Sequence, residues 1–85
     1  MAVKLVYFAD VRDALGRANE VIDLPEGVDS IEDLRGYFGA RGAPWSLLAE
    51  DRGLRFAVNR AMVDRADAPV NDGDEVAVFP PVTGG

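Results

Sequence analysis

Apolar and polar residues alternate in several short segments of the chain, as they do along the strands of a half-buried sheet. Residues 3–9 carry Val, Leu, Tyr and Ala at the odd positions and Lys, Val and Phe at the even positions, so the two sets face opposite ways. Similar alternation occurs in residues 20–24, 54–59 and 75–79, and a shorter apolar segment covers residues 61–63. The pattern therefore predicts about five strands.

Between the second and the third of these segments, the apolar spacing is helical. Asp29 or Ser30 can cap the helix, because Glu32 follows Asp29 at the spacing of a capping box. One apolar stripe follows the cap, and it consists of Ile31, Leu34 and Phe38. We expect this stripe to pack the helix against the sheet.

Glycine and proline mark the ends of the helical segments. Gly39 and Gly42 are expected to end the long helix, and Pro44 suits the first turn of a shorter one. Trp45, which follows, is expected to be an anchor of the core. Residues 11–15 are expected to form a further helical turn between the first two strands.

The predicted order is strand, strand, helix, short helix and then three strands, which indicates the α+β class with a mixed sheet and a helix packed on one face. The connection between the first and last strands is long enough for them to pair in parallel at the centre of the sheet. A chain of 85 residues has room for one small core. We assign residues 1–80 to a single domain and residues 81–85 to an extended C-terminal tail.

Composition excludes several classes of function. The chain has no cysteine and no histidine, so it lacks disulfides, thiolate metal sites, a cysteine nucleophile and an imidazole base. A net charge of −6 would repel nucleic acid, so neither DNA nor RNA is an expected partner. No apolar run approaches the roughly 20 residues that span a bilayer, so no membrane association is expected and a cytoplasmic location is predicted.

The arginines are dispersed among acidic residues, and we interpret them as a solvated surface. They are Arg12, Arg17, Arg35, Arg41, Arg52, Arg55, Arg60 and Arg65.

The last residues of the sequence carry the strongest chemical signal. They are Phe79, Pro80, Pro81, Val82, Thr83, Gly84 and Gly85. Two prolines end a strand and favour a stiff, extended departure from the fold, because they donate no backbone hydrogen bonds. From Pro80 the chain can reach on the order of 20 Å, which is enough to enter the pocket of another protein. Glycines have no Cβ atom, so the last two residues can pass through a narrow channel. The Gly85 carboxylate is then the group that can react inside the partner.

Three segments carry a family resemblance: LPEGVDSIEDLRGYF, AVN at residues 57–59, and DGDEVAVFPPVTGG. With them the chain resembles the small subunits of molybdopterin synthase, which are sulfur carriers with the ubiquitin-like β-grasp fold. The resemblance implies that an ATP-dependent adenylating enzyme activates Gly85 and that a sulfur donor system converts it to a thiocarboxylate. It also implies that the chain binds no cofactor and no metal, since the ATP is used by the activating partner.

The resemblance implies a second partner, the large catalytic subunit of molybdopterin synthase, in a heterotetramer. The tail would insert into that subunit and deliver sulfur to cyclic pyranopterin monophosphate during molybdenum cofactor biosynthesis. The small subunit would then be a sulfur donor and not an enzyme by itself.

The predicted sheet suggests where partners bind. If the first and last strands are neighbours, Phe8 and Phe79 lie on the face of the sheet that points away from the helix. Met62 on a neighbouring strand can join this apolar surface, and Arg12 can add a charge at its rim. The tail completes the predicted partner-binding set with Pro80, Pro81, Val82, Thr83 and Gly84.

Three alternatives remain open at this point. A thiamine-pathway sulfur carrier shares the fold and the terminal diglycine. A ubiquitin-like modifier would use the same activated glycine to form an isopeptide bond with lysines of target proteins. A binding module with an inert tail would not need Gly85 at all.

Overall fold

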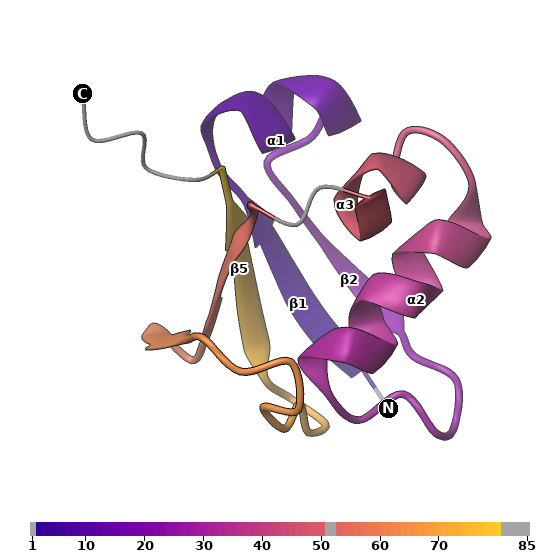
Figure 1. The fold of residues 1–85 in the computed structure, drawn as a ribbon, viewed down its shortest axis with the longest axis vertical. Helices are drawn as coiled ribbons and strands as arrows, with labels where there is room; N and C mark the ends of the chain where they lie inside the picture. The colour runs from indigo at the N-terminus through magenta and orange to yellow at the C-terminus, as the bar shows by residue number, and fades with distance from the viewer. Residues whose placement is uncertain (1, 51–52, 81–85) are drawn as a thin grey trace.

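The computed structural model describes residues 2–50 and 53–80 of the chain. Figure 1 shows a sheet with helices packed beside it. The elements are β1 (Ala2–Tyr7), α1 (Ala9–Leu15), β2 (Asn19–Asp23), α2 (Ile31–Arg41), α3 (Ser46–Glu50), β3 (Arg55–Val58), β4 (Ala61–Val63) and β5 (Glu75–Phe79). This order confirms the predicted α+β class. The predicted tail, residues 81–85, lies outside the described residues.

The sheet has the strand order β2-β1-β5-β3-β4. β1 and β5 pair in parallel at its centre, as predicted, and the other neighbours are antiparallel. α2 and α3 lie on one side of the sheet, and α1 lies at the end where β1 and β5 both finish (Figure 1). On the other side of the sheet, which we call the outer face, the described residues form no helix. The last described residue, Pro80, therefore leaves the sheet at its centre, beside α1.

The first strand is shorter than its alternation predicts. It ends at Tyr7, because the Phe8 carbonyl accepts hydrogen bonds from the N–H groups of Val11 and Arg12 and so starts α1. Ala9 begins this helix with a φ of 51°, in the left-handed region that an L-residue adopts only at a cost. Alternation alone did not reveal this turn, because Ala9 fits either element.

The predicted N-cap of the long helix is confirmed at Ser30, with Asp33 in place of Glu32 as the acid of the capping box, whereas Gly39 acts differently from its predicted role. Ser30 is the N-cap of α2, since its Oγ accepts the Asp33 N–H at 3.1 Å while the Asp33 carboxylate accepts the Asp29 N–H at 3.3 Å. Gly39 does not end α2, which continues to Arg41. A Cβ at Gly39 would lie 3.3 Å from the Cβ of Ala49, so the glycine lets α3 pack on α2 a few tenths of an ångström closer than a larger residue would.

The core lies between the inner face of the sheet and the helices. Val3, Leu5 and Tyr7 of β1 are buried because alternate side chains point to the same side. They meet the predicted helical stripe of α2 and the inner residues of β5. The most deeply buried side chains are Tyr7, Phe38, Leu5, Leu34, Val3, Val70, Val76 and Val78.

A charged cluster closes the β2 side of this core. The Glu20 carboxylate accepts hydrogen bonds from the Tyr7 hydroxyl at 2.9 Å, from Arg17 at 2.7 Å and from Arg41 at 2.6 Å. The Arg41 guanidinium also lies 3.9 Å from the centre of the Trp45 ring, a cation–π contact. Trp45 is thus half-buried at the edge of the core and packs beneath an arginine.

The prediction that the arginines form a solvated surface is wrong for two of them. Arg35 is 9% exposed, donates to the Ala49 carbonyl at 3.3 Å and lies over the Phe56 ring. Arg41 is held by Glu20 and Trp45. Long arginine stems can cover apolar surface while the guanidinium finds local acceptors, and sequence spacing does not reveal which arginines do so.

Within the described ranges, no helix is long and apolar enough to cross a membrane. The same residues contain no group of three or more acidic side chains arranged to hold a metal ion.

Candidate functional site

The outer face carries a pair of aromatic rings where the chain leaves the sheet. The ring centroids of Phe8 and Phe79 are 5.7 Å apart, and the planes meet at 65°, an edge-to-face arrangement. Phe8 is 46% exposed. Phe79 directly precedes Pro80 in the chain, and Phe8 packs against it. A partner that binds the tail would therefore contact these two rings.

Strand register explains why residues 71 positions apart in the sequence meet. Tyr7 is the parallel partner of Val78, and the Phe8 N–H donates to the Val78 carbonyl at 3.1 Å. Since Tyr7 and Val78 point into the core, the residues that follow them point to the outer face. The structure thus places Phe8 and Phe79 on the face where the sequence predicts them, while their binding role stays a prediction.

A low apolar row crosses the outer face next to the aromatic pair. Ala77 lies beside Val6 of β1 on one side and beside Ala57 of β3 on the other. Ala57 is in turn paired with Met62 of β4, which is 58% exposed. Met62 therefore belongs to the same face as the aromatic pair, and Ala57 and Ala77 lie between it and Val6 of β1.

Arg12 lies at the rim of this face. It is on α1, which packs against β5, and its side chain is 55% exposed. Its only ion-pair contact among the described residues is with its neighbour Asp13, at 4.0 Å. Arg12 is therefore available to a partner. The predicted site residues 81–85 lie outside the described residues, so the structure adds nothing to their predicted roles.

Sequence reasoning missed one residue of this site. Arg55, the first residue of β3, is in register with Phe79 and is exposed. The alternation in residues 54–59 already indicated its position, because it separates Arg55 from the buried Phe56. The interpretation of the arginines as a solvated surface gives Arg55 no role, because the sequence alone does not show that Phe79 lies beside it in the sheet.

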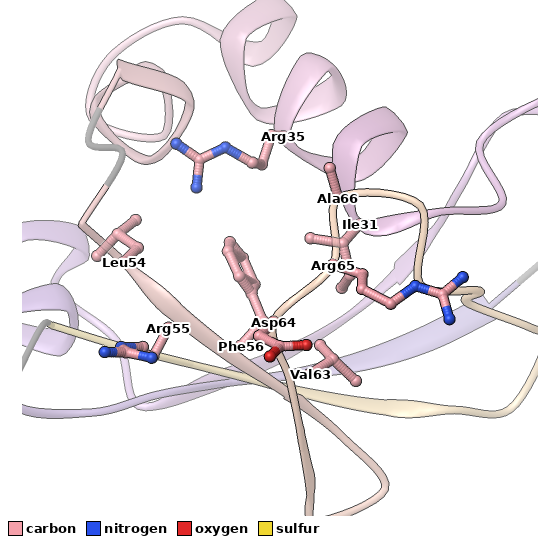
Figure 2. Close-up of a pocket in the computed structure, with 9 residues that line it drawn as sticks. All are labelled: Ile31, Arg35, Leu54, Arg55, Phe56, Val63, Asp64, Arg65 and Ala66. Carbon is pink, nitrogen blue, oxygen red and sulfur yellow. The ribbon is translucent and has the colours of Figure 1, made fainter.

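A shallow hollow of about 290 Å³ lies on the other side of β3, between that strand and α2. Figure 2 shows Arg35 and Phe56 pointing into it from α2 and β3, whereas Arg55 lies across the β3 ribbon from Phe56. The hollow is part of the helix side of the molecule. It is distinct from the outer face described above, although Arg55 is also among the residues that line it.

The fold and the outer face together define a class of protein. A mixed sheet with a parallel central pair, an α-helix across one face and a chain end that leaves from the centre is the ubiquitin-like β-grasp fold. The model of the ThiS family matches residues 5–85, and the chain belongs to this family. The predicted β-grasp fold is thereby confirmed.

Particular relatives are similar over the whole chain. The molybdopterin synthase sulfur carrier subunit of Escherichia coli strain K12 is 41% identical over 98% of this chain and 99% of its own. Among solved structures, a protein described as molybdopterin converting factor, subunit 1, from Pyrococcus furiosus has a TM-score of 0.75 and 35% identity, covering 96% of this chain and 99% of that one. Subunits 1 and 2 of molybdopterin-converting factor from Helicobacter pylori form a complex in which the matching chain has a TM-score of 0.66 and 26% identity, with 100% of both chains covered.

Proposed function

We propose that this protein is the sulfur-carrier subunit of a molybdopterin synthase and that Gly85 carries the sulfur as a thiocarboxylate. The observation that carries the proposal is the arrangement at the end of β5, where the half-buried Phe79 directly precedes Pro80 and packs against the exposed Phe8. The proposal is supported by the full-length similarity to the sulfur carrier subunit of Escherichia coli. The first partner is then a large catalytic subunit, as in the two-subunit complex from Helicobacter pylori.

The proposed chemistry begins at the Gly85 carboxylate. This group is ionised at neutral pH, because an α-carboxyl has a pKa near ~3.5, and it is a poor electrophile. An adenylating enzyme would let the carboxylate oxygen attack the α-phosphorus of ATP, with pyrophosphate leaving. A sulfur nucleophile from a donor system would then attack the carbonyl carbon and displace AMP. The product is a terminal thiocarboxylate.

The second stage takes place on the large subunit. The tail would enter its pocket, and the thiocarboxylate sulfur would attack a carbon of cyclic pyranopterin monophosphate and displace an oxygen substituent of that carbon. The product is a thioester that joins Gly85 to the pterin. Water would then cleave the acyl–sulfur bond, which leaves the sulfur on the pterin and returns Gly85 to a carboxylate for another cycle. Two deliveries would supply the two dithiolene sulfurs. The small subunit on this account binds no cofactor and donates sulfur, while the large subunit supplies the acid–base groups.

Intact mass tests the proposal directly. The purified chain, incubated with its adenylating enzyme, ATP and a sulfide donor, is expected to gain about 16 Da, because one oxygen is replaced by sulfur. The same mixture without ATP is the control and should show no gain. Heavier species linked to lysines of other proteins would instead favour the ubiquitin-like modifier, and an unchanged mass would contradict both.

Loss of the aromatic pair is expected to weaken binding. Phe79→Ala should reduce the affinity for the large subunit by a few kcal/mol if the ring is a buried anchor of the complex, with little effect on folding. Isothermal titration calorimetry measures this change. Leu47→Ala is the matched control, because Leu47 is 51% exposed but belongs to α3, on the helix side. Equal affinities of Phe79→Ala and the wild type would show that the outer face is wrongly assigned.

A further inference from the structure

Among the arginines that the structure describes, Arg55 has a position that no other shares. It pairs in register with Phe79, so its side chain leaves β3 on the outer face beside the aromatic pair. Phe56, the next residue, is buried on the opposite side of the strand, as Figure 2 shows. The Arg55 guanidinium is therefore presented at the place where the chain leaves the sheet.

Other exposed arginines of the described residues have ion-pair partners, including Arg12, which lies 4.0 Å from Asp13. Among the ion pairs of the described residues, Arg17 contacts Glu20, Arg60 lies near Glu75, and Arg65 contacts Asp67. No ion pair among these residues includes Arg55. In a chain of net charge −6, an exposed arginine without a local carboxylate is a charge available to a partner.

Arg55 is such a charge, and it lies next to the aromatic pair. Arg12 follows Phe8 on α1, and Arg55 lies beside Phe79 on the opposite side of β5 from Phe8. An apolar centre with a cation beside it matches a partner surface with an apolar patch beside a carboxylate, since charges across a protein interface are complementary.

We propose that Arg55 is a specificity-determining contact that receives an Asp or Glu side chain of the large subunit at the rim of the interface. The inference rests on the proposed function, because it assumes that the large subunit covers this face. A guanidinium can bind a carboxylate through two parallel hydrogen bonds, which fixes orientation as well as adding attraction. Arg55 would thereby help to align the start of the tail with the pocket of the large subunit.

The net negative charge of the chain does not oppose this contact strongly. The Debye length at physiological ionic strength is about 8 Å, so exposed charges farther than that from the contact are largely screened. The Arg55 charge, which has no ion pair among the described residues, is therefore still available to an approaching partner. Rim charges of this kind act mainly on the rate of association.

Charge reversal at this position tests the proposal. Stopped-flow binding of Arg55→Glu to the large subunit at low ionic strength is expected to be about tenfold slower than wild type, and that of Arg55→Gln about threefold slower. Both differences should shrink at high salt. Arg60→Glu is the control with the same charge change, because Arg60 is exposed at the β3–β4 turn, at the other end of β3. It should associate at the wild-type rate.

These measurements distinguish a wrong role for Arg55 from a wrong proposed function. If Arg55→Glu associates at the wild-type rate with the same salt dependence, while Phe79→Ala weakens binding, only the role of Arg55 is overturned. If the wild-type chain does not bind the large subunit, the proposed function fails and the inference fails with it. Equal unfolding midpoints of the arginine variants and wild type would establish that slow association does not come from loss of folding.

Discussion

A chain lengthened by one residue beyond Gly85 is expected to lose sulfur transfer while it still binds the large subunit. The extra residue moves the reactive carbonyl by roughly 3.5 Å, and any residue other than glycine adds a Cβ where the proposed channel is narrow. A misplacement of about 1 Å can already cost a hundredfold in rate, so activity should fall by at least that factor. The measurement is the rate of product formation from cyclic pyranopterin monophosphate with the adenylating enzyme, ATP, sulfur donor and large subunit present.

The control is a chain with a longer extension that a protease removes directly after Gly85. Cleavage should restore the wild-type rate, which shows that the extension and not a folding defect blocks the reaction. Calorimetry should give the extended chain an affinity within about threefold of wild type, because the outer face is unchanged. If the untrimmed chain transfers sulfur at the wild-type rate, the terminal carboxylate is not the reacting group.

Most of the fold could be predicted because its strands follow a period of two. The alternation in residues 75–79 fixes which side chains of β5 enter the core, whereas in β3 the consecutive residues Phe56 and Ala57 are both buried. The parallel pairing of β1 and β5 followed from the length of the connection between them. What the pattern missed depends on tertiary contacts: the turn at Ala9 and the glycine inside α2 at the contact with Ala49.

The positions of the site residues on the strands could also be predicted from the period of two. Register and alternation place Phe8 and Phe79 together, and they equally place Arg55 beside Phe79. The role of Arg55 was missed because a dispersed arginine gains meaning only when its neighbours across the strands are known. The contrast between Arg55, without an ion pair among the described residues, and Arg41, held by Glu20, is likewise not visible in the sequence.

The charged cluster around Glu20 has the largest expected effect on stability. Its carboxylate is 8% exposed and is hydrogen-bonded by Tyr7, Arg17 and Arg41. Removing one partner of a fully buried ion pair costs about 3–5 kcal/mol. Because the Arg17 side chain is 49% exposed and can be solvated, we expect a smaller loss for Glu20→Gln, about 2 kcal/mol at pH 7. Urea unfolding measures the free energy of unfolding of the variant and the wild type.

Control variants identify the source of this loss. Tyr7→Phe removes one hydrogen bond and leaves both ion pairs, so it should cost about 1 kcal/mol. Burial and the neighbouring Glu20 carboxylate raise the pKa of Tyr7, which keeps its hydroxyl a neutral donor at every pH of the experiment. Glu26→Gln makes the same charge change at an exposed loop position and should alter the free energy of unfolding by less than about 0.5 kcal/mol.

The pH dependence of the Glu20 effect has a definite sign. Burial by itself raises the pKa of Glu20, but hydrogen bonds from Arg41 and Tyr7 and the charges of Arg41 and Arg17 outweigh it, so the folded-state pKa is lower than usual. The unfolded value is near ~4.3, so the contribution of Glu20 is complete above that pH and is lost as the pH falls through the folded-state pKa. The stability difference between wild type and Glu20→Gln should therefore be constant from pH 7 to about 5 and decrease below about 4. A difference that stays unchanged down to pH 3, in the same urea titrations, would mean that the carboxylate charge is not what stabilises the cluster.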